Sequence, residues 1–383
     1  MKAERNFLPQ QYEVTGKLGI NHNYLQGQFA DHDEILAKIK QVVINGDFTL
    51  GREVDLIEDE YAATVGAKHG IGVGSGTDAL FLSLKALGVD KGDEVITTPY
   101  TFFATVGAIV TAGARPVFVD IRDDYNIDPY KIEAAVTSRT KAIVPVHWSG
   151  KPCDMDPIKE IADRRGLAIV EDACHAVKAT YRGRGAGVLG TLGCFSFHPL
   201  KNLNVWGDGG IITTDSDELA GKLRLMRNHG LINRDECAVF AYNSRLDTVQ
   251  AVVARHMLQK LDHITESRIS HSAYFDTHLR QIPQITVPER EAWIKQVYHL
   301  YIVMAERRDE LQKFLVSRGV DAKTHYPIPM HLQPAAKDFG YKPGDFPVCE
   351  ETVKRVISLP VHEFITQEQQ DTVIALVKEF YRA

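Results

Sequence analysis

The stretch Leu167-Ala168-Ile169-Val170-Glu171-Asp172-Ala173-Cys174-His175-Ala176 begins as an apolar run and then carries two carboxylates in succession. The run predicts a strand, Leu167–Glu171, that is buried on both faces like the strands of parallel sheets. Similar runs alternate with amphipathic stretches from about residue 70 to residue 215. This alternation predicts an α/β domain with a mostly parallel sheet and helices on both faces. The other expected strands are Gly70–Val73, Glu94–Thr97, Arg115–Val119, Ala142–Val146, Gly193–Phe197 and Gly210–Thr214.

The rest of the chain predicts further helices and a second, smaller domain. From about residue 265 the pattern changes to short strands such as Val297–Met304, a proline-rich stretch at His325–Pro334 and a closing helix at Gln367–Tyr381. At 383 residues the chain suits two domains. We predict a large α/β domain over residues 1–264, N-terminal extension included, and a small α+β domain over residues 265–383. The expected helices are Asp31–Asn45, Glu53–Thr64, Asp78–Leu87, Phe103–Thr111, Asp128–Val136, Asp156–Arg165, Ser216–Arg227 and Thr248–Ile264.

Composition narrows the class of protein. A formal net charge of -6 argues against a nucleic-acid surface, which needs clustered lysine and arginine. The longer apolar runs are too short to span a membrane, and the N-terminus lacks the apolar core of a signal peptide. Five scattered cysteines without a C-x-x-C pair favour a reducing cytoplasm over a disulfide framework or a metal site. We therefore expect a cytoplasmic protein that binds no nucleic acid, membrane or metal.

Asp172 stands at the C-terminal end of its predicted strand, where open α/β sheets bind their ligands. A buried carboxylate needs a cationic or hydrogen-bonding partner, and the protonated pyridine nitrogen of a cofactor is one such partner. Taken alone, Asp172 could equally cap a helix. His175 lies one turn further on; it could hydrogen-bond substituents of a cofactor ring, or be an ordinary core histidine.

The strongest local pattern is Ser196-Phe197-His198-Pro199-Leu200-Lys201-Asn202-Leu203, which Gly207-Asp208-Gly209-Gly210 follows. A lysine just after a buried strand, on a loop held by proline and asparagine, is well placed to lose its hydration. Burial lowers the pKa of a lysine, and the neutral amine is the form that makes a Schiff base with a carbonyl. A lysine taken without this context is most often a surface residue.

Two more strand ends carry candidate cofactor residues. Gly72-Val73-Gly74-Ser75-Gly76-Thr77-Asp78-Ala79-Leu80 is a glycine-rich strand-to-helix turn, and the free N–H groups of such a turn bind phosphate readily. A dinucleotide motif is disfavoured, because Thr77 stands where that motif needs glycine. Pro99-Tyr100-Thr101-Phe102-Phe103 follows the next strand. An aromatic side chain there could stack on a flat cofactor or belong to the core.

Taken together, these motifs resemble the DegT/DnrJ/EryC1/StrS family, the sugar aminotransferases that have the type I fold of aspartate aminotransferase. The resemblance extends from about Asp47 to Leu359. Further motifs that carry it are Gly92-Asp93-Glu94-Val95-Ile96, Asn228-His229-Gly230, Asn243-Ser244-Arg245-Leu246-Asp247, His325-Tyr326-Pro327 and His331-Leu332-Gln333-Pro334. The family implies pyridoxal 5'-phosphate (PLP) as cofactor, with pyridoxamine 5'-phosphate (PMP) as its intermediate form.

The resemblance assigns a role to each candidate. Lys201 would form the internal aldimine and then shuttle a proton, while Asp172 pairs with the pyridine nitrogen. The other cofactor contacts would be Gly76, Thr77 and Ser196 at the phosphate, Phe102 on the ring, His175 near the ring hydroxyl, and Asn243 at the phosphate of the partner subunit. Asn243 thus implies a homodimer with shared sites. Tyr326 and His331 are substrate candidates, and Arg245 is a candidate for a substrate carboxylate unless it pairs with Asp247.

The implied reaction moves an amino group from L-glutamate to a nucleotide-linked keto-sugar by ping-pong chemistry. The family's dehydratase branch has histidine where this chain has Lys201, so aminotransfer is favoured. Several motifs are most similar to enzymes of 3-keto-6-deoxyhexoses, whereas Trp148 and Lys178 depart from the family pattern and leave the sugar open. The alternatives are another PLP reaction on the same fold, a non-catalytic regulatory relative that binds cofactor or sugar, and a nicotinamide-linked dehydrogenase. The last leaves Lys201 and Asp172 unexplained.

Overall fold

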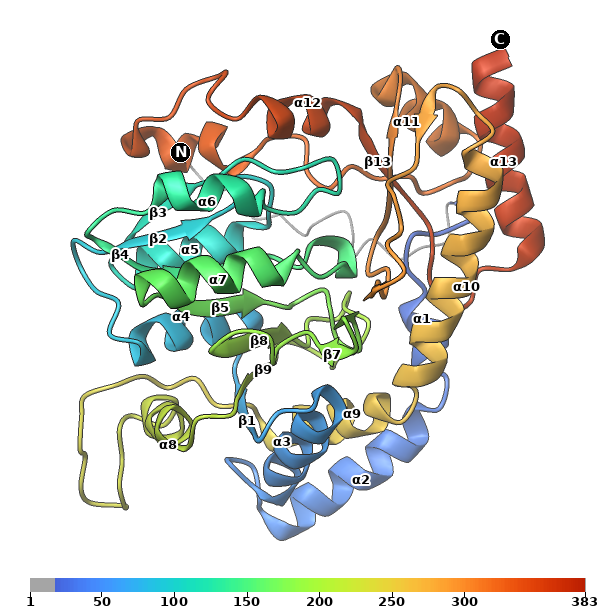
Figure 1. Cartoon of the computed structure of the whole chain (residues 1–383). Helices are drawn as coiled ribbons and strands as arrows, with labels where there is room; N and C mark the ends of the chain where they lie inside the picture. Colours follow the sequence, from blue (N-terminus) through green and yellow to red (C-terminus); the bar gives the residue numbers. More distant parts are fainter. Residues whose placement is uncertain (1–17, 383) are drawn as a thin grey trace, which may run out of the picture.

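A computed structural model describes residues 18–382 and has a seven-stranded sheet at its centre (Figure 1). The strand order is β1-β9-β8-β5-β4-β2-β3; β9 runs antiparallel to β1 and β8, and the other neighbouring pairs of this sheet are parallel. The predicted α/β domain with a mostly parallel sheet is confirmed. The strands are β1 (His69–Val73), β2 (Glu94–Thr97), β3 (Arg115–Phe118), β4 (Thr140–Ile143), β5 (Ala168–Asp172), β8 (Leu192–Ser196) and β9 (Gly210–Thr214).

Helices cover both faces of this sheet, because successive side chains of a buried strand point to opposite sides. Val95 of β2 packs against helices α4 and α5, whereas its neighbour Ile96 packs toward α6 and α7. In β8, Cys194 faces the first layer and Phe195 faces α3 and α9. The helices of the large unit are α1 (Leu25–Gln28), α2 (His32–Asn45), α3 (Arg52–Val65), α4 (Gly76–Ala86), α5 (Phe103–Thr111), α6 (Pro129–Ala135), α7 (Met155–Arg165), α8 (Asp217–Met226) and α9 (Thr248–Leu258).

The expected helix Thr248–Ile264 is wrong: the structure has two helices there. α9 ends at Leu258, and α10 (Leu261–Leu279) begins after a break at Gln259–Lys260. The apolar period continues through the break, so the sequence gives no sign that a second helix begins, which shares the core of α9 at its start and enters the core of the small unit further on. Lys260 marks the bend, and its ammonium donates to the Gln28 carbonyl and to the Asp31 carboxylate. Helix α10 runs straight through residues 264–265, where we expected the domain boundary.

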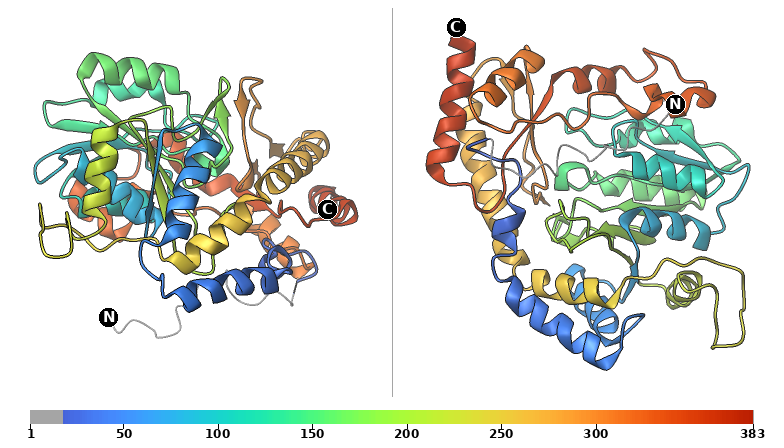
Figure 2. Two further views of the ribbon diagram at one scale, coloured as in Figure 1. Left: turned by 90° about the horizontal axis from the view of Figure 1, so that it is seen from below. Right: turned by 180° about the vertical axis from the view of Figure 1, so that it is seen from behind.

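A second unit surrounds a three-stranded antiparallel sheet, in which β12 lies between β10 and β13. Figure 2 shows α10 and α13 side by side along the edge of the molecule. Ile20 pairs with Val320 and shares this unit's core, so the start of the described chain packs here. The elements are α10, α11 (Arg308–Ser317), α12 (Pro347–Arg355), α13 (Gln367–Arg382), β10 (Ile285–Thr286), β12 (Tyr301–Ala305) and β13 (Val356–Leu359); β6 (Thr180–Tyr181), β7 (Arg184–Gly185) and β11 (Ile294–Lys295) form a small third sheet.

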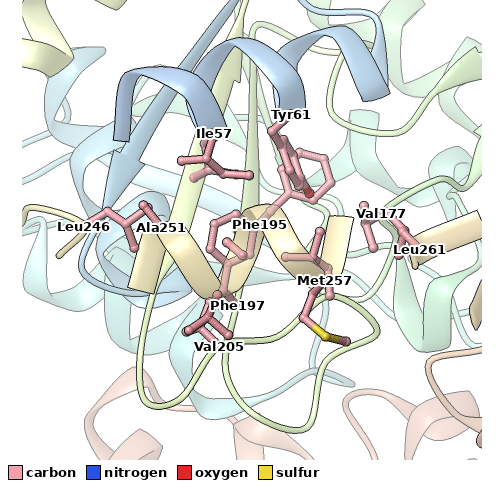
Figure 3. Close-up of a cluster of buried hydrophobic side chains, with 14 of the residues drawn as sticks. Ile57, Tyr61, Val177, Phe195, Phe197, Val205, Leu246, Ala251, Met257 and Leu261 are labelled. Atoms are coloured by element: carbon pink, nitrogen blue, oxygen red, sulfur yellow. The ribbon is translucent and has the colours of Figure 1, made fainter. Parts of the chain in front are cut away.

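One hydrophobic cluster holds the loop that carries Lys201. Phe197 and Val205 flank the loop and pack with Tyr61 of α3 and Met257 of α9 (Figure 3). The Val205 amide also donates to the Phe197 carbonyl over 2.9 Å, which closes the loop at its base. The loop therefore projects from a fixed base at the end of β8.

Candidate active site

A cavity of about 280 Å³ lies at the carboxyl ends of the central strands. Turns after β1, β2, β4, β5 and β8 form one wall, and segments 22–23, 299–300 and 323–326 form the other. We call these the cofactor wall and the substrate wall. The predicted site residues that line the cavity are Gly76, Thr77, Phe102, Asp172, His175, Ser196, Lys201 and Tyr326.

Asp172 is buried at the end of β5, and neutral groups hold its carboxylate in place. Its Oδ2 accepts a hydrogen bond from the Thr105 hydroxyl over 2.7 Å, and its Oδ1 accepts one from the Cys174 amide over 3.2 Å. Each oxygen can accept a further hydrogen bond. The geometry keeps an acceptor-rich group at the cavity floor, suited to a cationic ring nitrogen.

Lys201 lies across the same cavity on its loop. The Lys201 amide donates to the His198 carbonyl over 2.9 Å, and the Asn202 side chain ties the loop to the Val297 carbonyl over 3.1 Å. Burial lowers the pKa of the Lys201 amine, although Cys174 and Asp172 partly offset the effect. This lowered pKa makes the neutral amine, which is the nucleophilic form, more accessible than in a lysine exposed to water.

The N-terminus of α4 opens into the cavity. The Ser75 hydroxyl caps the helix by accepting from the Asp78 amide over 3.0 Å, which leaves earlier N–H groups for an anion. A Cβ at Gly76 would lie 2.6 Å from the Ser196 Cβ and 3.0 Å from the Cys174 Sγ. Glycine is therefore required at Gly76 for helix α4 to approach strand β8 closely enough to share one anion site with Ser196.

Aromatic and imidazole rings occupy the middle of the cavity. The rings of His175 and His299 lie 4.1 Å apart, with Trp148 packed 5.1 Å from His175. Burial holds the pKa values of both histidines well below their ordinary value. Their Nδ1 atoms are buried without a hydrogen-bond partner among the described residues. Phe102 is 44% exposed, and its ring lies 5.8 Å from that of Tyr326.

Three predicted site residues do not line the cavity within the described chain. His331 is buried beside Phe346, and its Nε2 lies 3.1 Å from a Glu350 oxygen. Asn243 is exposed on the surface. Arg245 donates to the Asn228 side chain over 2.9 Å, and the alternative ion pair with Asp247 is absent from the described contacts.

Lys178, which departs from the family pattern, also does not line the cavity and pairs with Asp262 over 2.7 Å. Sequence reasoning missed several residues of the substrate wall, namely His22, Asn23, His299 and Lys323. No local motif marks them, because they come together from distant segments.

The fold and the cavity define a class of protein: a type I enzyme that places a half-buried lysine and a buried carboxylate around a flat, phosphorylated cofactor. A model of the DegT/DnrJ/EryC1/StrS aminotransferase family matches residues 30–378. The chain belongs to this family, which confirms the expected family and enzyme class.

Curated relatives cover nearly the full length of the chain. A pleiotropic regulatory protein of Geobacillus stearothermophilus is 45% identical over 352 residues, 91% of this chain and 95% of the relative. A dTDP-3-amino-3,4,6-trideoxy-alpha-D-glucose transaminase of Streptomyces venezuelae is 42% identical over 345 residues, 90% and 91% of the two chains. A UDP-N-acetyl-3-dehydro-alpha-D-glucosamine 3-aminotransferase of Acidithiobacillus ferrooxidans is 40% identical over 357 residues, 92% and 96%.

Solved structures agree with this assignment. DesV of S. venezuelae, solved with a ketimine intermediate, has a TM-score of 0.93 at 40% identity and covers 95% of this chain and 99% of its own. NtdA of Bacillus subtilis, solved with bound cofactor PMP, has a TM-score of 0.88 at 30% identity and covers 96% and 88%. The type I fold is thereby confirmed. None of the helices in residues 18–382 is long and apolar enough to cross a membrane.

Proposed function

We propose that the chain is a PLP-dependent aminotransferase that moves an amino group from L-glutamate to a nucleotide-linked keto-sugar. The observation that carries this function is that the half-buried Lys201 and the buried Asp172 line one cavity, with the N-terminus of α4 beside them. The orphaned Nδ1 atoms of His175 and His299 show a site with unmet hydrogen-bonding capacity. These residues fit PLP, the cofactor of the family.

Each residue has a part that follows from its position. When bound, PLP supplies a carbonyl for the amino group and a ring that delocalises the electron pair left by proton removal. The α4 N-terminus with Thr77 and Ser196 would hold its phosphate, and Phe102 would cover its ring. Asp172 would keep a proton on the ring nitrogen by charge pairing.

Lys201 moves the proton of the reaction. As a neutral amine it would take the Cα proton of the amino donor and return a proton to the cofactor carbon, a role that its lowered pKa suits. Donor and acceptor then use the same cavity in turn, so the exchange is ping-pong. His175 and His299 stay neutral at this site and offer hydrogen bonds without repelling a cationic amine.

The substrate proposal rests on the relatives, whose names give amino groups at sugar carbon 3 and both dTDP and UDP as carriers. Together with the motif resemblance, they favour a 3-keto sugar, and a 3-keto-6-deoxyhexose in particular. The residues of the substrate wall that face the cavity, Tyr326 above all, would contact it.

We also propose a homodimer with shared sites, in the cytoplasm. Its support is an exposed apolar loop next to Asn243, in which Phe240 is 99% exposed, Ile232 62% and Val239 49%. Monomeric proteins seldom expose such a patch. Asn243, exposed beside it, would then reach the cofactor phosphate of the partner subunit.

The absorption spectrum tests the function directly. Purified protein supplied with PLP should show the yellow band of a lysine-bound cofactor, and L-glutamate should bleach it to the PMP form. Lys201→Ala should lack the yellow band. A protein that stays colourless with PLP would refute the cofactor, whereas a yellow protein that ignores glutamate would refute the donor.

A regulatory role is the second candidate function, because the Geobacillus relative is named a pleiotropic regulatory protein. A regulatory protein would bind PLP or a sugar nucleotide without turnover. Multiple turnovers with glutamate and a dTDP- or UDP-linked 3-keto sugar, followed as 2-oxoglutarate release, would exclude a purely regulatory role.

A further inference from the structure

The cavity is short of positive charge for an enzyme that handles dicarboxylates and nucleotide sugars. Among the described residues of its lining, the lysines are Lys201 and Lys323, and there is no arginine. Five histidines line it as well, but burial lowers the pKa of each, so they stay neutral near pH 7. Since Lys201 must react as a neutral amine, Lys323 is the remaining cation.

Lys323 is held firmly on the substrate wall. Its amide donates to the Ser358 carbonyl over 3.0 Å, and the Ser358 amide donates back over 2.8 Å. The side chain of His325, two residues on, also contacts Ser358, at 2.9 Å. This pairing to β13 fixes the backbone of Lys323. Burial holds the pKa of His325 well below its ordinary value, and the nearby charges of His22, Lys323 and Lys201 add to this effect.

We propose that Lys323 binds an oxyanion of a substrate, foremost a carboxylate of the amino donor. This inference rests on the proposed aminotransferase function and adds the residue that recognises substrate charge. An ammonium against a carboxylate makes a charge-assisted hydrogen bond, stronger than a neutral one. The diphosphate of a sugar nucleotide offers the same chemistry, so the experiment must separate the two sources.

An ion pair with Asp321 is the competing explanation for Lys323. The Lys323 ammonium lies 3.1 Å from Asp321 Oδ1, with side chains 25% and 17% exposed. Asp321 is engaged elsewhere too, because its Oδ2 accepts from the His22 amide over 3.1 Å. A lysine ammonium has three donors, and this contact uses one of them. Capacity for a substrate oxyanion remains.

The two explanations predict opposite responses to two substitutions. Removing the cation in Lys323→Met should weaken anion binding, whereas Asp321→Asn should strengthen it by releasing the cation. If the pair is only structural, both variants should change anion binding in the same direction or leave it unchanged. Lys178→Met is the matched control, since Lys178 is 30% exposed, pairs with one aspartate and does not line the cavity.

The experiment uses PLP-loaded protein and two readouts. Calorimetry measures the binding of glutarate, an unreactive dicarboxylate, and of dTDP and UDP. Stopped-flow absorbance gives the half-saturating L-glutamate concentration and the maximal bleaching rate. Lys323→Met should raise the glutarate Kd and the half-saturating glutamate by about 10- to 100-fold and leave the maximal rate nearly unchanged. Lys323→Arg should retain most of the affinity, and Asp321→Asn should tighten glutarate binding by about 2- to 5-fold.

Each outcome decides the matter. A loss confined to dTDP and UDP binding supports the oxyanion site and assigns it to the sugar nucleotide. Glutarate, dTDP and UDP affinities that match wild type in Lys323→Met would overturn the proposal, as would equal losses in Lys323→Met and Lys178→Met. A wild-type protein that gains no colour with PLP fails earlier and refutes the proposed function instead.

Discussion

The two walls of the cavity are built in different ways. Short turns that directly follow strands of one sheet form the cofactor wall, so backbone geometry fixes Asp172 and Gly76. Segments far apart in the chain form the substrate wall, where His22 meets residue 321 through contacts about 300 positions apart. The residues proposed to hold the cofactor thus lie on a rigid frame, whereas the residues proposed to contact the substrate depend on packing between distant segments.

The largest expected effect on the cofactor wall is a loss of stability on removal of the buried carboxylate next to Asp172. Glu171 is fully buried and pairs with the His147 ring over 2.8 Å. It also accepts from the backbone amides of Gly187, Leu189 and Gly190. Glu171→Ala leaves all four donors without a partner, so the free energy of unfolding should fall by about 3–5 kcal/mol. Urea unfolding followed by circular dichroism measures this loss.

Glu94 is the matched control for Glu171. It is equally buried, on β2 of the same sheet, but its partner Arg139 is 61% exposed. In Glu94→Ala the guanidinium can return to water, so the loss of stability should be clearly smaller. Equal losses in the two variants would show that Glu171 has no special bracing role.

The second test sharpens the chemistry of the cofactor wall. Asp172→Asn keeps the shape of the side chain but cannot pair with a protonated ring nitrogen. We expect the rate of bleaching by glutamate to fall by about 100- to 1000-fold, the size of loss typical for one preorganised electrostatic group. Asp208→Asn, at an exposed acidic residue of the same cavity, should change the rate little. Stopped-flow absorbance compares them, and similar rates in both would contradict the role of Asp172.

The same contrast explains what the sequence could predict. Strands β2 and β9 and helix α5 fall on their expected bounds, because buried strands and their helices leave strong periodic patterns. Lys201, Asp172 and Gly76 were predictable because each lies next to a strand end within a local motif.

The substrate wall was not predictable in this way. Lys323 and His299 have no local pattern, and their approach to the cavity depends on the packing of β12 and β13. His331 shares a motif with Tyr326, yet a turn of 3-10 helix at Met330–Leu332 directs it into the core beside Phe346. The spacing of apolar residues likewise could not show the bend between α9 and α10, because the helical spacing continues through it.

Acid should gradually lower the free energy of unfolding, because buried histidines lie in and near the substrate wall. Burial lowers the pKa of His22 to about 3 and that of His362 to about 4. The charge of Lys323 lowers the pKa of His22 further, whereas a hydrogen bond to Asp321 raises it, and the charge of Arg268 lowers the pKa of both histidines. Below pH 6.5 these two histidines bind protons in the unfolded chain, whereas in the folded chain they remain neutral until the pH approaches their lowered pKa values. Stability therefore falls as pH drops from about 6.5 toward 4, by up to about 1.4 kcal/mol per pH unit for each histidine. Urea unfolding at pH 6.5, 5.5 and 4.5 measures the slope.

A variant shows whether His22 causes that slope. His22→Gln keeps a neutral polar side chain and should flatten the fall in stability between pH 6.5 and 4.5. His32→Gln, at an exposed histidine, should retain the wild-type slope. If both variants keep the full slope, the acid sensitivity arises from histidines other than His22.

The smallest expected effect separates two residues of one loop. Tyr326 faces the cavity, with its ring 5.7 Å from Trp148 and 5.8 Å from Phe102, whereas His331 is held by Glu350 outside the cavity. One substrate hydrogen bond is worth about 0.5–1.5 kcal/mol, so Tyr326→Phe should raise the KM for the sugar nucleotide by about 2- to 12-fold. The half-reaction with glutamate should keep its rate.

His331→Asn should leave the KM for the sugar nucleotide unchanged and lower stability through lost contact with Glu350. Steady-state kinetics with thermal unfolding of both variants makes the comparison. If His331→Asn raised this KM and Tyr326→Phe did not, the loop must change conformation when the sugar nucleotide binds. Only a rearranged loop could bring His331 to the substrate.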